Sequence, residues 1–83
     1  MKRDVRLMKK RGKDMDKLEA ALLILAEGKA LPAKNRDHQL SGNLAGFREC
    51  HIEGDWLLIY RIFKDKLIVS ASGTGTHADL FGN

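Results

Sequence analysis

The stretch from Phe47 to Tyr60, FRECHIEGDWLLIY, decides the fold predicted for this chain. It is typical of a β-hairpin, with a first arm over Phe47–Ile52, a turn at Glu53–Asp55 and a second arm over Trp56–Phe63. The second arm is apolar on both faces, which is typical of a central strand that is covered on both sides. We therefore predict a small antiparallel sheet with this hairpin in its middle.

Side chains of the first arm alternate between two faces of the predicted sheet. One face takes Phe47, Glu49 and His51, and the other takes Arg48, Cys50 and Ile52. The hairpin also holds the only Trp and the only Tyr of the chain. A purely structural hairpin does not need this mixture of imidazole, guanidinium, carboxylate and aromatic groups, so we expect a functional surface here.

Two helices are predicted before the hairpin. The first covers about residues 2–13 and is rich in lysine and arginine. The second covers about residues 14–27, where the apolar residues have helical spacing over a face wide enough to be buried against a sheet. Asp14 or Asp16 is the expected N-cap of this second helix, and Gly28 is the expected residue after its C-cap.

The remaining segments complete an α+β fold. Residues 29–46 are predicted to form a loop, and Lys66–Ser72 a third strand. Thr76 is expected to cap a last helical turn over His77–Phe81. We therefore predict an N-terminal helical hairpin packed on a small antiparallel sheet, with a short C-terminal helix, in a single domain over residues 1–83.

Composition narrows the classes of partner. The net charge is +4 and the pI about 9.5, which favours nucleic acid or an acidic protein as partner. A single cysteine excludes an internal disulfide and is typical of a reducing cytosol. Because no apolar run approaches the roughly 20 residues of a membrane span, we expect no membrane-spanning segment and a cytoplasmic protein.

Three separated motifs stand out in the chain: DHQL at 37–40, GFRECHIEGDWLLIY at 46–60 and GTGTHADLFG at 73–82. Together they resemble the YafQ branch of the RelE superfamily, whose members are bacterial toxins of type II toxin–antitoxin pairs. The resemblance implies a RelE-like fold and a ribosome-dependent endonuclease that cuts mRNA at the codon in the A site. It also implies a cognate antitoxin as partner, with a heterotetramer or larger complex as one expected assembly.

The resemblance also assigns functional positions. They are His38, His51, Asp55, Trp56, His77 and Phe81, and Arg48 also matches the motif. Metal-independent RNA cleavage uses the 2′-OH as nucleophile, and needs a base, an acid and positive charge at the phosphorane. Histidine can serve as acid or base near neutral pH. We expect His51 and His77 to be the acid–base pair, with His38 as a third candidate, and which is the base stays open.

The other expected roles concern orientation and binding. Asp55 is expected to orient a histidine, and Trp56 and Phe81 are expected to stack on bases. No cofactor and no metal are expected, because the three histidines lack short ligand spacing and Cys50 is the only cysteine.

The chain departs from the family pattern in two places. Many relatives carry an arginine where this chain has Gly73, and its loss shifts stabilisation of the phosphorane to Arg48, Arg61 or a lysine. Family members usually open with a β-strand, whereas this sequence begins inside the helix that follows, so we expect that strand to be absent.

Two other functions remain open on the sequence alone. One is a catalytically weakened toxin homologue that is kept as an antitoxin-binding or regulatory module, which Gly73 favours. The other is a ParE-like inhibitor of gyrase, against which the histidine set argues because that branch needs no acid–base pair.

Overall fold

The computed structural model describes residues 2–63 and 68–82. Its helices are α1 (Lys2–Lys10), α2 (Met15–Ala26) and α3 (His77–Phe81), with short 3-10 turns η1 (Ala33–Asn35) and η2 (Gly42–Leu44). Its strands are β1 (His38–Gln39), β2 (Arg48–Glu53), β3 (Trp56–Phe63) and β4 (Ile68–Gly75). The predicted α+β class, with a helical hairpin first and a short helix last, is confirmed.

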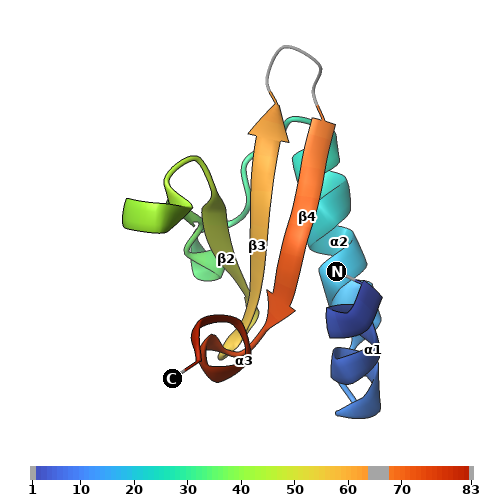
Figure 1. The fold of residues 1–83 in the computed structure, drawn as a ribbon. Coiled ribbons are helices and arrows are strands. Elements are labelled where there is room, and N and C mark those ends of the chain that lie inside the picture. Colours follow the sequence, from blue (N-terminus) through green and yellow to red (C-terminus); the bar gives the residue numbers. More distant parts are fainter. Residues whose placement is uncertain (1, 64–67, 83) are drawn as a thin grey trace.

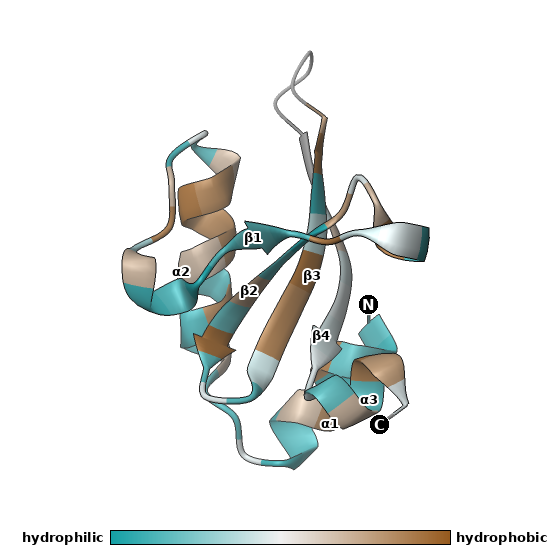
Figure 2. Cartoon of the chain, turned by 90° about the vertical axis from the view of Figure 1, so that its left-hand side faces the viewer, coloured by the Kyte–Doolittle hydropathy of each residue, from teal (hydrophilic) through white to brown (hydrophobic). Residues whose placement is uncertain are grey.

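The four strands form one antiparallel sheet in the order β1-β2-β3-β4. The predicted hairpin is the β2–β3 pair, and β3 lies between two neighbours as its apolar sequence indicates. Figure 1 shows α1 and α2 along one side of the sheet and α3 at the end of β4. In Figure 2, hydrophobic residues concentrate on β3 and α2, whereas α1 and β1 are largely hydrophilic.

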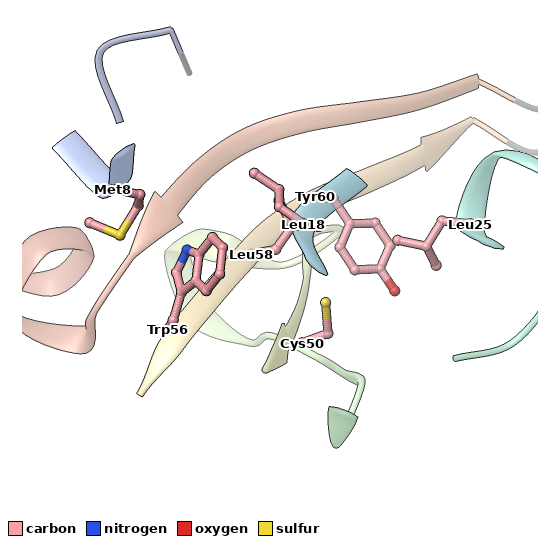
Figure 3. Close-up of a cluster of buried hydrophobic side chains, with 7 residues drawn as sticks. All are labelled: Met8, Leu18, Leu25, Cys50, Trp56, Leu58 and Tyr60. Atoms are coloured by element: carbon pink, nitrogen blue, oxygen red, sulfur yellow. The ribbon is translucent and has the colours of Figure 1, made fainter. Parts of the chain in front are cut away.

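The core lies between the sheet and the helical hairpin. Its seven buried side chains, drawn in Figure 3, are Met8, Leu18, Leu25, Cys50, Trp56, Leu58 and Tyr60. Alternate residues of β3 supply three of these side chains, because side chains two apart on a strand share a face. Cys50 is fully buried in this core, with no exposed surface.

Local sequence signals define the helix ends. Asp14 is the N-cap of α2 and accepts a hydrogen bond from the backbone N–H of Asp16 at 3.0 Å, so Asp16 is not the cap. Gly28 follows the C-cap of α2 with a φ of +77°, a conformation that favours glycine. Thr76 caps α3 in a reciprocal capping box with Asp79, which confirms the predicted last turn.

Two sequence predictions were wrong in part. Residues 29–46 are not only loop, because β1 pairs with β2 and sets His38 opposite Glu49. The third strand runs on to Gly75 instead of ending at Ser72, with an irregularity in the β3–β4 register between Ile59 and Tyr60. Its predicted start at residues 66 and 67 lies outside the described residues.

The edge of β4 away from β3 lies beside α1. The backbone N–H of Thr74 donates to the carboxylate of Asp4 at 3.2 Å, which satisfies one donor of that edge. Within residues 2–63 and 68–82, no strand precedes α1. None of the helices in this part of the chain is long and apolar enough to cross a membrane.

Candidate active site

The candidate site lies on the sheet face opposite the core, which we call the open face. The register of β2 and β3 pairs His51 with Leu57 and Glu49 with Ile59, so Glu49 and His51 share this face, as the alternation predicted. The β1 pairing brings His38 beside Glu49. The N-terminus of α3 adds His77, so three segments distant in sequence meet here.

All three histidines converge on one carboxylate. The Nε2 atoms of His38, His51 and His77 lie 3.7, 3.9 and 3.7 Å from Oε1 of Glu49. The rings of His51 and His77 are 6.2 Å apart between centroids. These Nε2–Oε1 distances exceed a direct hydrogen bond but are short enough for strong electrostatic coupling.

The other ring nitrogen of each histidine is already bonded. Nδ1 of His38 lies 2.8 Å from the carbonyl oxygen of Arg36, and Nδ1 of His51 lies 3.0 Å from the carbonyl oxygen of Gly54. Nδ1 of His77 lies 2.6 Å from the carboxylate of Asp55. Carbonyl and carboxylate oxygens only accept hydrogen bonds, so each Nδ1 carries the proton that it donates. Nε2 is therefore the nitrogen that can gain or release a proton, and all three face Glu49.

Asp55 and Phe81 frame His77. Asp55 lies in the turn between β2 and β3, and its hydrogen bond from His77 lowers the pKa of its carboxyl group below the usual value. This contact matches the orienting role expected for Asp55. The Phe81 ring is half-buried and lies 5.9 Å from the His77 ring between centroids. Both residues therefore lie where the sequence predicted a functional surface.

Sequence reasoning missed the part that Glu49 plays. Its side chain is only 6% exposed, and burying a carboxylate is costly unless other groups compensate its charge. The three imidazoles are the groups that can do so here. The available signal was the alternation that places Glu49 on the face of His51, but nothing in the sequence indicated that His38 and His77 would lie around it.

The structure places Arg48 away from the histidines, and its expected substrate-binding role stays a prediction. Arg48 belongs to the other face of β2, where its Nε donates to Oδ1 of Asp37 at 3.2 Å. The hydroxyl of Tyr60 donates to the same carboxylate oxygen. Burial, together with the Asp37 carboxylate, raises the pKa of Tyr60 well above its usual value. Arg48 is thus part of a link that holds the segment before His38, and it does not face the histidines.

The expected stacking role of Trp56 is wrong. Trp56 is 1% exposed, and its indole N–H donates to Oγ1 of Thr74 at 2.8 Å. The Thr74 hydroxyl in turn donates to the Leu57 carbonyl oxygen at 2.7 Å. Because the residue is almost fully buried, the side chain offers no surface to a base. Figure 3 draws Trp56 among the other core side chains.

Gly73 occupies the position at which the resemblance implies an arginine, and Arg61 was one of the residues expected to replace that cation. Gly73 is buried, and a Cβ built there lies 3.2 Å from Cδ2 of Leu80 and 3.3 Å from Oδ2 of Asp4, so a side chain at this position would require these two side chains to shift slightly. Arg61 is exposed on the open face, as the alternation of β3 requires. Its guanidinium lies against the rings of Phe47 and Phe63 and does not reach the histidines.

The arrangement of possible metal-ligating side chains bears on which chemistry the site can support. Across the described part of the chain, no group of three or more His, Cys, Asp or Glu side chains is arranged to hold a metal ion.

Comparisons with known proteins agree with the fold and the motifs. Residues 1–82 match the family model described as "Bacterial toxin of type II toxin-antitoxin system, YafQ". The chain is 47% identical over 81 residues to the mRNA interferase toxin YafQ of Escherichia coli K12, an alignment that covers 96% of this chain and 86% of that protein.

Solved structures show the same likeness. The crystal structure of YafQ from E. coli BL21(DE3) superposes with a TM-score of 0.91 at 40% identity, covering 99% of this chain and 90% of that one. YafQ in the E. coli DinJ–YafQ complex gives a TM-score of 0.88 at 41% identity, with coverage of 99% and 90%. The chain therefore belongs to the YafQ family of bacterial toxins of type II toxin–antitoxin systems.

Proposed function

We propose that this chain is a ribosome-dependent mRNA endonuclease that cuts the codon in the A site by metal-independent attack of the 2′-OH. The observation that carries the proposal is the convergence of three Nε2 atoms on Glu49, with every Nδ1 held as a donor. The name of the E. coli relative, mRNA interferase toxin, supports the substrate class.

The site holds the groups that this reaction needs. An unprotonated Nε2 takes the proton of the 2′-OH, whose oxygen attacks the neighbouring phosphorus. A protonated Nε2 gives its proton to the leaving 5′-oxygen, and the product is a 2′,3′-cyclic phosphate. Positioned acid and base groups of this kind typically contribute 10²–10⁴-fold each to the rate.

His77 is the best candidate for the acid. It is the one ring with a carboxylate at each nitrogen, since Asp55 bonds to Nδ1 and Glu49 lies near Nε2. His51 and His38 have a neutral carbonyl oxygen at Nδ1 instead. We assign the base role to His51, whose ring centroid lies 6.2 Å from that of His77. We assign to His38 a stabilising contact with the phosphorane.

The partners follow from the same proposal. The substrate is messenger RNA on the ribosome, in the bacterial cytoplasm. A cognate antitoxin protein binds the toxin and inhibits it. The exposed basic residues of α1 add positive charge that attracts both ribosomal RNA and an acidic antitoxin. The DinJ–YafQ complex of E. coli supports the antitoxin as partner.

Primer extension on a reporter mRNA in a bacterial translation extract tests the proposal. The wild-type chain should produce new cuts within A-site codons, and these should require ribosomes. His77→Ala should abolish them, whereas Glu19→Ala, an exposed change on α2, should leave them intact. Circular dichroism of each variant checks the fold. Cuts that persist in His77→Ala would remove His77 from the site.

One observation favours a second function. Gly73 stands where the resemblance places an arginine, so this position supplies no cation. A homologue without that cation could serve as an antitoxin-binding regulatory module. The regulatory module would be favoured over the endonuclease by three results together. The folded protein would bind the antitoxin tightly, would produce no cuts in mRNA, and would cause no growth arrest when its expression is induced.

A further inference from the structure

We propose that Phe47, Arg61 and Phe63 form a base-binding subsite for the RNA strand, beside the histidine cluster on the open face. We call these three residues the aromatic–arginine stack. The proposal deepens the endonuclease function and rests on it. The proposed ligand is an unpaired nucleobase of the RNA strand that is cut, a short distance along that RNA strand from the scissile phosphate.

The guanidinium of Arg61 lies between two aromatic rings. Its Cζ is 5.5 Å from the Phe47 ring centroid and 5.1 Å from the Phe63 ring centroid, both within the range of a cation–π contact. Phe63 is 40% exposed, which makes it one of the few large hydrophobic side chains at the surface of the described residues. Within that part of the chain, no carboxylate forms an ion pair with Arg61.

The stack continues the candidate active site along the sheet. The register pairs Glu49 with Ile59 and Arg48 with Tyr60, so Phe47 comes level with Arg61 at the next step. Residues two apart on a strand share a face and are about 7 Å apart. Phe47 is thus about 7 Å along the strand from Glu49 and about 13 Å from His51. A short single strand leaving the histidines along β2 and β3 reaches the stack.

Two aromatic rings and a guanidinium plane suit this ligand. Unpaired RNA bases stack on aromatic rings and on arginine guanidinium planes, and the guanidinium also attracts phosphate. Phe81 lies beside His77 at the opposite end of the cluster, so aromatic side chains border the histidines at both ends. The alternative is a surface cluster that only stabilises this end of the sheet.

Single-turnover cleavage on mRNA-programmed ribosomes separates the two readings. The rate is measured against protein concentration, which gives a half-saturation concentration and a maximal rate. Arg61→Lys keeps the charge but removes the plane, and Phe63→Leu keeps the apolar character but removes the ring. Each should raise the half-saturation concentration about tenfold, the loss expected for one stacked base, with the maximal rate within about twofold of wild type.

Matched controls sit outside the stack. Lys29→Arg, after the end of α2, is the reverse charge-conserving change at a side chain that is 70% exposed, and Leu23→Ala on α2 truncates a hydrophobic side chain that is 56% exposed. Neither should change the half-saturation concentration. An unchanged half-saturation concentration in both stack variants overturns the subsite and leaves the endonuclease standing. If the stack variants instead have a lower melting temperature and a lower maximal rate but the wild-type half-saturation concentration, the stack only stabilises the fold. That result also overturns the subsite.

A second measurement tests the subsite even if the wild-type chain shows no cleavage. Binding of a fluorescent single-stranded RNA oligonucleotide to the isolated protein is followed by anisotropy. About tenfold weaker binding by Arg61→Lys and Phe63→Leu supports an RNA-binding stack even though the endonuclease proposal has failed. Equal binding by wild type and both variants overturns it. Weaker binding of the antitoxin alone would assign the surface to a protein partner, which also overturns it.

Discussion

Trp56→Phe tests whether the largest aromatic side chain of the chain supports the fold or contacts RNA. The change keeps an aromatic ring but removes the indole N–H that donates to Thr74. The Thr74 hydroxyl keeps its own acceptor, the Leu57 carbonyl oxygen, so no buried donor is left without a partner. The cost therefore comes from one lost hydrogen bond and from the space that the smaller ring leaves.

The magnitude follows from burial. A buried neutral hydrogen bond contributes about 1 kcal/mol net, and partial truncation of a fully buried aromatic side chain costs about 1–2 kcal/mol more. We expect the free energy of unfolding to fall by about 2–3 kcal/mol, and the melting temperature by about 10–20 °C. A domain of this size has roughly 4–12 kcal/mol of stability, so the variant stays folded at 25 °C.

Two assays decide the question. Thermal and urea unfolding followed by circular dichroism measure the loss of stability, because the variant has no tryptophan fluorescence. Cleavage at 25 °C measures function, and we expect the half-saturation concentration to stay within about twofold of wild type. An unchanged melting temperature together with a tenfold higher half-saturation concentration would refute the reasoning, because it would show that the indole contacts substrate.

Three further predictions concern groups away from the histidines. Burial raises the pKa of Cys50 to about 12, so iodoacetamide at pH 8 should modify the thiol only after unfolding, as mass spectrometry would show. Tyr60→Phe removes a hydrogen bond to the Asp37 carboxylate and should lower the free energy of unfolding by about 1–2 kcal/mol, which urea titration measures; an equal midpoint would contradict it. The hydrogen bond from Arg11 holds the pKa of Asp79 well below its usual value, so this pair stabilises the fold above the unfolded pKa of about 3.9 and loses its effect as pH falls through the folded pKa. Asp79→Asn should therefore lower the melting temperature at pH 7, and the gap from wild type should shrink below about pH 4; a constant gap would contradict it.

Local patterns predicted most of the fold. Alternation along Phe47–Ile52 identified both faces of β2, and the apolar run from Trp56 identified the central strand. Thr76 allowed α3 to be predicted, because a capping box needs only residues that are close in sequence. β1 escaped prediction because two residues are too short to show alternation, and its pairing depends on a partner strand ten residues away.

The site was harder to predict because it is built from distant segments. Motif resemblance found His38, His51 and His77, but the role of Glu49 appears only when β1 and α3 meet β2. The roles given to Arg48 and Trp56 came from the resemblance alone. The alternation had already placed Arg48 on the face opposite His51, so the sequence held the evidence against that role.

The central claim is that Glu49 is a positioning residue, whose carboxylate holds the Nε2 atoms of the three histidines in one cluster for cleavage. Its most direct test is the single-turnover cleavage rate of Glu49→Gln on mRNA-programmed ribosomes, beside Glu19→Gln as the matched change on the exposed face of α2. The account predicts a maximal rate at least about 100-fold below wild type for Glu49→Gln, with a native circular dichroism spectrum, and a wild-type rate for Glu19→Gln. A folded Glu49→Gln variant that cuts at the wild-type rate would contradict the account.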